Sequence, residues 1–239
     1  MYNRDYLTDQ SNSHSNESSQ RQAYIMSFLK ATYQLFAGSM LAATAGAYIG
    51  LEIVSALVGM HWILFIAVMG LVFFVIPRVK HKQGINLVAL FGVTFLTGLM
   101  IAPLLASILA MPGGAAIAGQ AFLMTSIAFG GISMFAMTTK KDFSFMGGFL
   151  FASFWILFAA GIIFALGTTF GWFAYSSIFH LFLSSGIAIL MCGFILYDTQ
   201  QIIKGNYDSP VEAALSLYLD FFNLFVSLLQ ILGIMRSND

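Results

Sequence analysis

The sequence predicts an all-α integral membrane protein, a seven-transmembrane-helix bundle whose seventh helix is central and carries a polar stripe. Hydrophobic residues make up 59% of the 239-residue chain and charged residues only 8%, whereas soluble domains carry about 25% charged residues. The few charges divide the chain into apolar runs of spanning length, and the basic residues fall in alternate loops. The formal net charge of zero argues against a nucleic-acid partner, and a single cysteine excludes a disulfide framework.

The start of the chain differs in composition from the rest. It is rich in Ser, Asn and Gln, and it contains no short apolar run followed by a small-residue cleavage site. We therefore expect residues 1–22 to form a disordered polar tail in the cytoplasm and residues 23–239 to form one transmembrane domain. The first spanning helix would then serve as an uncleaved insertion signal.

Charged residues delimit the first four spanning helices. The uncharged run between Lys30 and Glu52 is long enough for one helix, and the run between Glu52 and Arg78 is long enough for a second, since about 20 apolar residues cross a bilayer. The uncharged stretch 83–139 is too long for one span. It contains the turn signal Met-Pro-Gly-Gly at 111–114, so we expect it to hold the third and fourth helices.

The second half of the chain predicts three more helices. The uncharged run 143–197 is broken by glycines and threonines at 167–171, which separate a fifth helix from a sixth. The seventh segment, about 210–235, is apolar but is interrupted by Asp220.

The positions of Lys and Arg predict the orientation, because short cytoplasmic loops carry an excess of basic residues. Basic residues occur in the tail and in the loops after the second, fourth and sixth helices: Arg4, Arg21, Lys30, Arg78, Lys80, Lys82, Lys140, Lys141 and Lys204. The loops after the first, third and fifth helices have none. This alternation places the N-terminus in the cytoplasm, and seven full spans place the C-terminus outside. A re-entrant seventh segment, which would return the C-terminus to the cytoplasm, is the alternative.

The first helix carries small residues at every fourth position, Gly38, Ala42, Gly46 and Gly50. Small residues at this spacing let two helices approach closely. We expect them to pack inside the bundle, and a dimer interface is the alternative.

Two acidic residues lie within the predicted spans, Asp198 near the end of the sixth helix and Asp220 inside the seventh. Ser209 and Glu212 predict a capping box at the start of the seventh helix, which places Asp220 about half a bilayer deep. If the sixth helix ends near Lys204, the two carboxyls are offset by about one helical turn. Direct or water-bridged contact is then feasible. Because ionisable residues in a span are costly, both are candidate functional residues.

The seventh helix also carries other polar residues at steps of three or four: Glu212, Ser216, Asp220, Asn223, Ser227 and Gln230. Residues at this spacing share one face of a helix. A polar stripe on a spanning helix does not face lipid, so this helix is expected to be central. Ser216, Asn223, Ser227 and Glu212 are therefore candidates for lining a pore.

The two aspartates suggest a proton-controlled latch on a cation path. Two close carboxyls in a low dielectric are expected to share a proton and to titrate as one coupled unit. Loss of that proton leaves repulsion and an oxygen-rich site for Ca²⁺, so Asp198 and Asp220 are also the candidate metal ligands. Arg78 is the expected counter-ion. The alternative is a purely structural pair that Ser, Asn, Tyr or Arg partners satisfy.

The residues at 214–225, Ala-Leu-Ser-Leu-Tyr-Leu-Asp-Phe-Phe-Asn-Leu-Phe, resemble the signature of the Bax inhibitor family of transmembrane proteins. The Leu-Tyr-Asp sequence that ends at Asp198 and the Lys-Lys-Asp-Phe-Ser loop at 140–144 also match that family. The resemblance extends from about residue 22 to the end of the chain.

This resemblance implies a seven-helix protein associated with a pH-sensitive Ca²⁺ leak and a paired-aspartate sensor at Asp198 and Asp220. The family arginine corresponds more loosely to Arg78, because the loop here reads Pro-Arg-Val-Lys-His-Lys. The chain lacks the charged tail of many animal relatives, which favours a bacterial member in the inner membrane. The family also implies membrane-protein partners, such as a membrane protease. Beyond Ca²⁺ as a permeant ion, no cofactor is expected.

Two other function classes fit parts of the pattern. A non-conducting regulator of other membrane proteins would use the acidic pair only to hold the bundle together. An intramembrane aspartyl protease also places Tyr-Asp on one helix and Asp on the next, but it needs Gly-x-Gly-Asp at the second site, where this chain has Tyr-Leu-Asp at 218–220. We therefore do not expect an enzyme.

Overall fold

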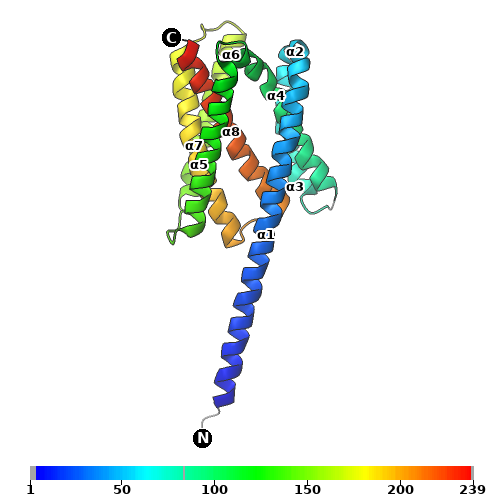
Figure 1. Cartoon of the computed structure of the whole chain (residues 1–239), viewed down its shortest axis with the longest axis vertical. Helices are drawn as coiled ribbons and strands as arrows, with labels where there is room; N and C mark the ends of the chain where they lie inside the picture. The colour runs from blue at the N-terminus through cyan, green and yellow to red at the C-terminus, as the bar shows by residue number, and fades with distance from the viewer. Residues whose placement is uncertain (1–3, 83, 238–239) are drawn as a thin grey trace.

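The computed structural model describes the backbone of residues 4–82 and 84–237, and the side chains of residues 19–82 and 84–236. The described chain contains only helices and their connections (Figure 1). In chain order these are α1 (Arg4–Glu52), α2 (Val54–Gly70), the π-helix η1 (Leu71–Val75), α3 (Ile76–Val79), α4 (Ile85–Leu109), α5 (Gly114–Thr138), α6 (Met146–Thr169), α7 (Ser177–Lys204) and α8 (Pro210–Ser237).

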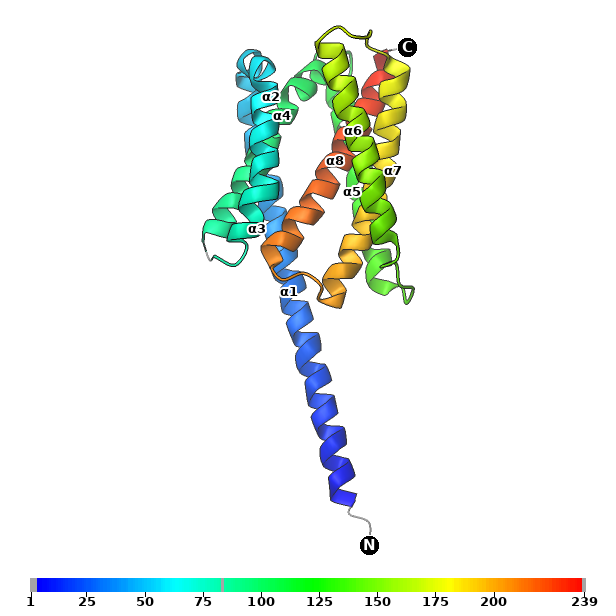
Figure 2. The same ribbon diagram turned by 180° about the vertical axis from the view of Figure 1, so that it is seen from behind.

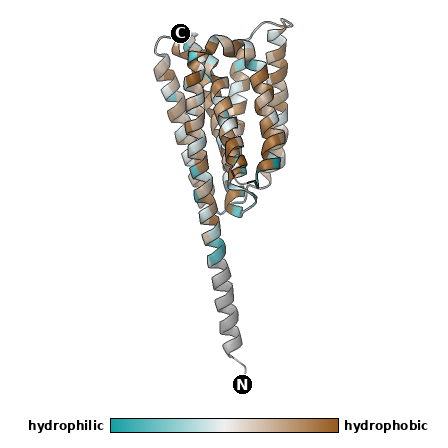
Figure 3. Ribbon diagram, turned by 90° about the vertical axis from the view of Figure 1, so that its right-hand side faces the viewer, coloured by the Kyte–Doolittle hydropathy of each residue, from teal (hydrophilic) through white to brown (hydrophobic). Residues whose placement is uncertain are grey.

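Seven helical segments of the described chain are long and apolar enough to cross a membrane, because α2, η1 and α3 follow one another as a single span. The all-α, seven-span prediction is therefore confirmed. The interruptions at 110–113 and 170–176 fall at the predicted turn signals. Apolar residues predominate along the spanning helices (Figure 3), and many large apolar side chains are exposed on them, as expected of surfaces that contact lipid.

Helix α1 begins well before the first membrane span. Residues 4–22 continue it as one helix that projects away from the bundle (Figures 1 and 2). These residues belong to the segment 1–22 that the composition marks as a tail, and residues 1–3 lie outside the described chain. The disorder expected of this tail and its cytoplasmic location stay predictions.

The second span changes its helical form near its end. Leu71–Val75 is π-helical, and Pro77 follows in the first turn of α3. Proline has no amide hydrogen, and its ring crowds the carbonyl four residues earlier. A wider π-helical turn accommodates this defect, so the span continues through Pro77 to Val79.

The small residues of α1 pack against α4. A methyl group added to Gly46 would overlap the Phe95 carbonyl oxygen of α4, and one added to Gly98 of α4 would overlap the Ala43 carbonyl oxygen of α1. Gly50 lies in the same contact, against Ala102. The two backbones thus approach as closely as small residues allow, and the intramolecular interpretation of the glycine spacing is confirmed.

Helix α8 is the central helix of the bundle. It packs against α7, α1, α5 and α4, a larger share of it is buried than of any other span, and it contributes residues to all three buried apolar clusters. It runs through the bundle as one continuous helix, and the two termini lie at opposite ends (Figures 1 and 2). A continuous helix of this length favours seven full spans over a re-entrant seventh segment, and the side of the membrane on which the C-terminus lies stays a prediction.

Candidate functional site

The structure brings Asp198 and Asp220 together at the α7–α8 contact. Asp198 lies six residues before Lys204, the last residue of α7, and Asp220 lies ten residues after Pro210, the first residue of α8. Each aspartate is only 5% exposed. The two side chains are close enough to interact directly, both by charge and by hydrogen bonding. The sequence predicts that the two carboxyls are offset by about one helical turn, and in the structure they are in contact.

The two carboxyls differ in their other partners. Ser216, one turn before Asp220 on α8, donates its hydroxyl hydrogen to Oδ2 of Asp198. Oδ2 of Asp220 is buried and has no hydrogen-bond partner in the described structure. Asp198 therefore accepts hydrogen bonds as a carboxylate would, whereas Asp220 is the side of the pair with free bonding capacity.

A tyrosine in the α7–α8 loop completes the group. The half-buried Tyr207 phenol interacts with the Asp198 carboxyl and with Ser216, and its ring packs against the large apolar cluster around α7 and α8. Burial and then the Asp198 charge raise the pKa of Tyr207, so its hydroxyl keeps its hydrogen. In the sequence only its place in the short loop between the two helices that carry the aspartates points to Tyr207.

The start of α8 is tied to the end of the second span by Lys80. Its ammonium group lies 3.0 Å from Oδ2 of Asp208 and 3.0 Å from Oε2 of Glu212, and its carbonyl accepts a hydrogen bond from the Ser209 hydroxyl at 3.1 Å. These carboxylates raise the pKa of Lys80, and Lys80 in turn lowers the pKa of Asp208. From the sequence Lys80 is only one of several basic loop residues that orient the protein.

The predicted capping box forms only in part. Ser209 caps α8, since its Oγ accepts a hydrogen bond from the Val211 amide at 3.2 Å. The Glu212 carboxylate, however, binds Lys80. The charge on Lys80 offers Glu212 a stronger partner than a neutral backbone amide does.

The structure does not bring Arg78 to the acidic pair. Arg78 is exposed, its Nη1 donates to the Phe74 carbonyl at 2.6 Å, and its guanidinium lies 5.9 Å from the centre of the Phe74 ring. Ile76 is buried at 3% exposure, and two residues further along a helix a side chain points to the opposite face. Lys80, four residues after Ile76, shares the inward direction instead.

The rest of the polar stripe on α8 lies against protein, as predicted. Ser227 is 2% exposed. The Gln230 amide oxygen accepts a hydrogen bond from Ser184 of α7 at 2.8 Å, while Asn223 donates back to the Leu219 carbonyl of its own helix at 2.8 Å. Ser227 and Gln230 thus lie against the bundle as predicted. The role of Ser216, Asn223, Ser227 and Glu212 in lining a pore stays a prediction.

The acidic pair is a poor fit for a resident metal. Within 19–82 and 84–236, no group of three or more His, Cys, Asp or Glu side chains is arranged to hold a metal ion. Bound Ca²⁺ takes six to eight oxygen ligands, and the pair offers two carboxylates beside the hydroxyls of Ser216 and Tyr207. The role of Asp198 and Asp220 as ligands of Ca²⁺ therefore stays a prediction.

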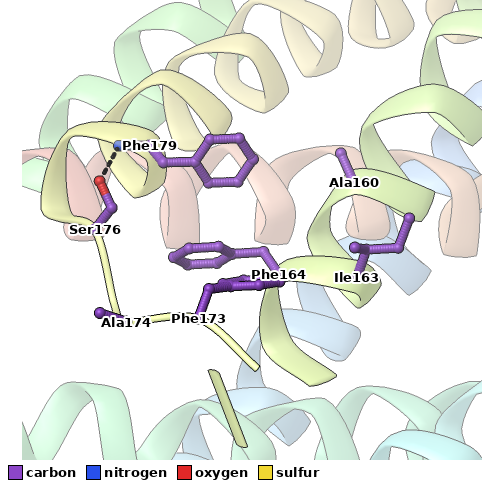
Figure 4. Close-up of a pocket in the computed structure, with 7 residues that line it drawn as sticks. All are labelled: Ala160, Ile163, Phe164, Phe173, Ala174, Ser176 and Phe179. Carbon is purple, nitrogen blue, oxygen red and sulfur yellow. Dashed lines mark hydrogen bonds between the residues drawn. The ribbon is translucent and has the colours of Figure 1, made fainter. Parts of the chain in front are cut away.

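An apolar pocket lies at the other end of α7. Its volume is about 480 Å³, and its walls are side chains of α6, α7 and their connection (Figure 4): Ala160, Ile163, Phe164, Phe173, Ala174, Ser176 and Phe179. The Ser176 hydroxyl oxygen accepts the Phe179 amide at 3.3 Å as the cap of α7. The pocket therefore offers little polar chemistry, and the acidic pair remains the candidate site.

Comparison with known proteins gives a consistent result. The family described as "Inhibitor of apoptosis-promoting Bax1" matches residues 25–237. A protein of Campylobacter jejuni is 47% identical over 99% of both chains. An uncharacterized membrane protein of Vibrio cholerae is 40% identical over 88% of this chain and 91% of its own.

A viral relative has a more descriptive name. The Golgi anti-apoptotic protein of vaccinia virus is 35% identical over 65% of this chain and 61% of its own length. The family model covers residues 25–237 and the Campylobacter jejuni relative covers 99% of the chain, so the similarity is not confined to one motif.

Proposed function

Since the chain belongs to the Bax inhibitor family and is a multi-pass membrane protein, we propose that it conducts a pH-sensitive leak of Ca²⁺, with Asp198 and Asp220 as the latch. We place it in a bacterial inner membrane with its N-terminus in the cytoplasm. The observation that carries the proposal is the direct contact of two buried carboxyls across the α7–α8 interface.

The contact needs a proton. Two ionised carboxylates this close in a low-dielectric interior would repel each other. Asp198 already accepts a hydrogen from Ser216, whereas Asp220 has an oxygen without a partner. The shared proton is therefore best assigned to Asp220, which donates it to Asp198 and so bridges α7 and α8.

Loss of this proton changes both the contact and its chemistry. The hydrogen bond that joins the two helices is replaced by charge repulsion between the two carboxylates. Their four oxygens then become available to a hard cation. Ser216, Asn223 and Ser227 continue the polar face of α8 beside the pair. A Ca²⁺ ion that meets the opened pair would find this face along the same central helix, so titration and permeation would be coupled.

The test is Ca²⁺ flux through purified protein in liposomes over a series of pH values. An asparagine mimics a protonated carboxyl and cannot lose its proton. We therefore expect Asp198→Asn and Asp220→Asn to show, at every pH, the flux that the unmodified protein shows at low pH. Asp142→Asn, which changes an exposed aspartate in the α5–α6 loop, is the control and should keep the normal pH dependence.

Two results would contradict the latch. One is equal flux at every pH in the unmodified protein and in the double variant Asp198→Asn/Asp220→Asn. The other is loss of pH dependence in the Asp142→Asn control as well.

A second candidate function is a regulator that does not conduct ions. It is favoured by the vaccinia relative, whose name describes protection from cell death rather than transport. In this case the protein would act through membrane-protein partners, and the liposomes would show no flux at any pH. We propose no enzymatic activity, because Asp220 lacks the flanking glycines of the intramembrane proteases.

A further inference from the structure

We propose that the α5–α6 connection, residues 139–145, is a docking surface for the headgroups of anionic phospholipids, with Lys140 and Lys141 as its cationic contacts. The connection lies at the end of the bundle from which α1 projects (Figures 1 and 2). The proposal goes beyond the proposed function and does not depend on it, because it involves neither the acidic pair nor the movement of ions.

A buried glutamine of α7 holds the backbone of this connection. Gln200 is 5% exposed. Its Oε1 accepts a hydrogen bond from the Phe143 amide at 2.9 Å, and its Nε2 donates to the Lys141 carbonyl at 2.8 Å. One side-chain amide thus uses both its acceptor and its donor on two backbone groups of the connection. The backbone that carries Lys141 is therefore fixed to α7.

A second set of contacts joins the connection to the end of α7. The Ser144 hydroxyl oxygen accepts hydrogen bonds from Gln201 at 3.2 Å and from Lys204 at 2.7 Å. Lys204 also forms an ion pair with Asp142, whose carboxylate accepts the Ser144 amide at 2.8 Å. The connection is thus ordered before it meets a partner, and an ordered surface loses little conformational entropy on binding.

Charge pairing at this end of the bundle leaves the two lysines available. The acidic side chain of the connection, Asp142, is paired with Lys204, and the carboxylates at the start of α8 are both bound to Lys80. Lys140 and Lys141 are exposed. Neither forms an ion pair in the part of the chain whose side chains the structure describes. Two adjacent ammonium groups therefore remain for an anion outside the protein.

The residues that follow the lysines place this surface at the edge of the acyl region. Phe145 is 80% exposed, and Phe149, in the first turn of α6, is 71% exposed. A smaller share of α6 is buried than of any other span, so these rings face lipid. A lysine beside apolar surface extends its ammonium group to the polar layer.

This combination commits the surface to a phospholipid. Lipid-facing rings and free ammonium groups within a few residues fit a partner that offers both acyl chains and a negative headgroup. A nucleic acid or a soluble acidic protein offers no acyl chain. Anionic lipids attract basic residues next to a membrane span, at about fivefold in binding for each lysine near the surface.

The experiment compares two lipids on the full-length protein purified in detergent. The protein is mixed with equal amounts of phosphatidylglycerol and phosphatidylcholine that have identical acyl chains, and native mass spectrometry measures which lipid stays bound. Lys140→Gln/Lys141→Gln removes the cationic contacts. The matched control is Lys30→Gln/Lys82→Gln, which removes the same charge from two exposed lysines outside the connection. Gln200→Leu keeps the charge and removes the hydrogen bonds that fix the backbone.

The unmodified protein should retain phosphatidylglycerol in preference to phosphatidylcholine. In Lys140→Gln/Lys141→Gln we expect this preference to fall by about fivefold for each lysine removed. Lys30→Gln/Lys82→Gln should keep most of the preference. Gln200→Leu should lower it by a smaller factor than the loss of both lysines, because the ammonium groups remain but their backbone is no longer fixed.

Equal losses in the two double variants would overturn the proposal, because total charge rather than this connection would then set the preference. Equal retention of both lipids by the unmodified protein would overturn it too. Glycerol phosphate, which has no acyl chains, should not be retained, and retention as strong as that of phosphatidylglycerol would indicate a site for free anions instead. The lysines are exposed, so their variants decide the question even if Gln200→Leu does not fold. Absence of Ca²⁺ flux would contradict the proposed function without affecting this result.

Discussion

At the end of the bundle with the α3–α4 and α7–α8 connections, the contacts of each side chain depend on the face of the helix from which it points. Ile76 faces the core, so Lys80, one turn later, reaches the start of α8, whereas Arg78 turns outward to Phe74. Two basic residues in one short segment thus have different roles. The inward lysine joins the end of α3 to the start of α8, and the outward arginine is exposed beside Phe74.

A second charged contact at this end gives a pH-dependent prediction. Lys204 forms an ion pair with Asp142 and also donates to the Ser144 hydroxyl at 2.7 Å. Beside it, the Gln200 side chain binds the Lys141 carbonyl at 2.8 Å. Lys204 and the Ser144 amide lower the pKa of Asp142 to about 2, compared with about 3.9 for an unperturbed aspartate.

Because the folded pKa of Asp142 is depressed, its contribution to stability is fully present above about pH 3.9 and is lost as the pH falls through about 2. We expect Asp142→Asn to melt at a lower temperature than the unmodified protein near neutral pH. The difference should shrink as the pH is lowered from about 4 towards 2. Thermal unfolding in detergent at a series of pH values measures it, with Lys140→Gln as the control. A difference that is constant over this range would contradict the assignment.

At the scale of whole elements, α1 and α4 approach each other closely through their glycines. Gly46 of α1 and Gly98 of α4 each lie against a backbone carbonyl of the opposite helix. A backbone atom cannot move aside as a flexible side chain can. The packing of α1 against α4 therefore requires glycine at both positions.

The same substitution at two glycines of α4 should have different effects on stability. Gly98→Ala places a methyl group on the Ala43 carbonyl, and we expect a loss of about 1–3 kcal/mol of stability from overpacking. At Gly92 an added methyl meets no atom within 4 Å, so Gly92→Ala should be neutral or should stabilise by up to about 1 kcal/mol through helix propensity. Thermal unfolding in detergent compares the two. Equal destabilisation by both variants would refute the close-contact explanation.

At the scale of the whole molecule, the described chain contains seven helices long enough to span a membrane, and an odd number of spans predicts that its two ends lie on opposite sides. α8 crosses the entire bundle and ends at the face opposite the start of α1 (Figure 2). The α3–α4, α5–α6 and α7–α8 connections, beside Lys80, Lys140 and Lys204, lie at the end of the bundle from which α1 projects (Figures 1 and 2). The positive-inside rule therefore predicts that this end faces the cytoplasm.

This topology predicts the behaviour of reporter fusions. A reporter that is active only outside the cytoplasm should be active when fused after α8, or when inserted in the connection 170–176. The same reporter inserted in the α3–α4 connection, next to Lys82, should be inactive. Activity in the α3–α4 connection together with inactivity after α8 would mean that the assigned orientation is reversed.

Much of this architecture could be predicted from the sequence. The seven spans, the start of α8 at Pro210 and the end of α7 at Lys204 follow from local composition and turn chemistry. The contact of Asp198 with Asp220 also follows, because the short loop and the fixed rise of a helix leave the two carboxyls at nearly the same depth.

The sequence alone therefore determined which segments cross the membrane and at what depth each acid lies, because both depend on neighbours along the chain. Only the tertiary structure decided which side chains meet across helices: Lys80 rather than Arg78 at the start of α8, and Gly98 against Ala43. These contacts join residues on different helices. They depend on the rotation of each helix about its axis, which packing sets and which a turn such as η1 can alter.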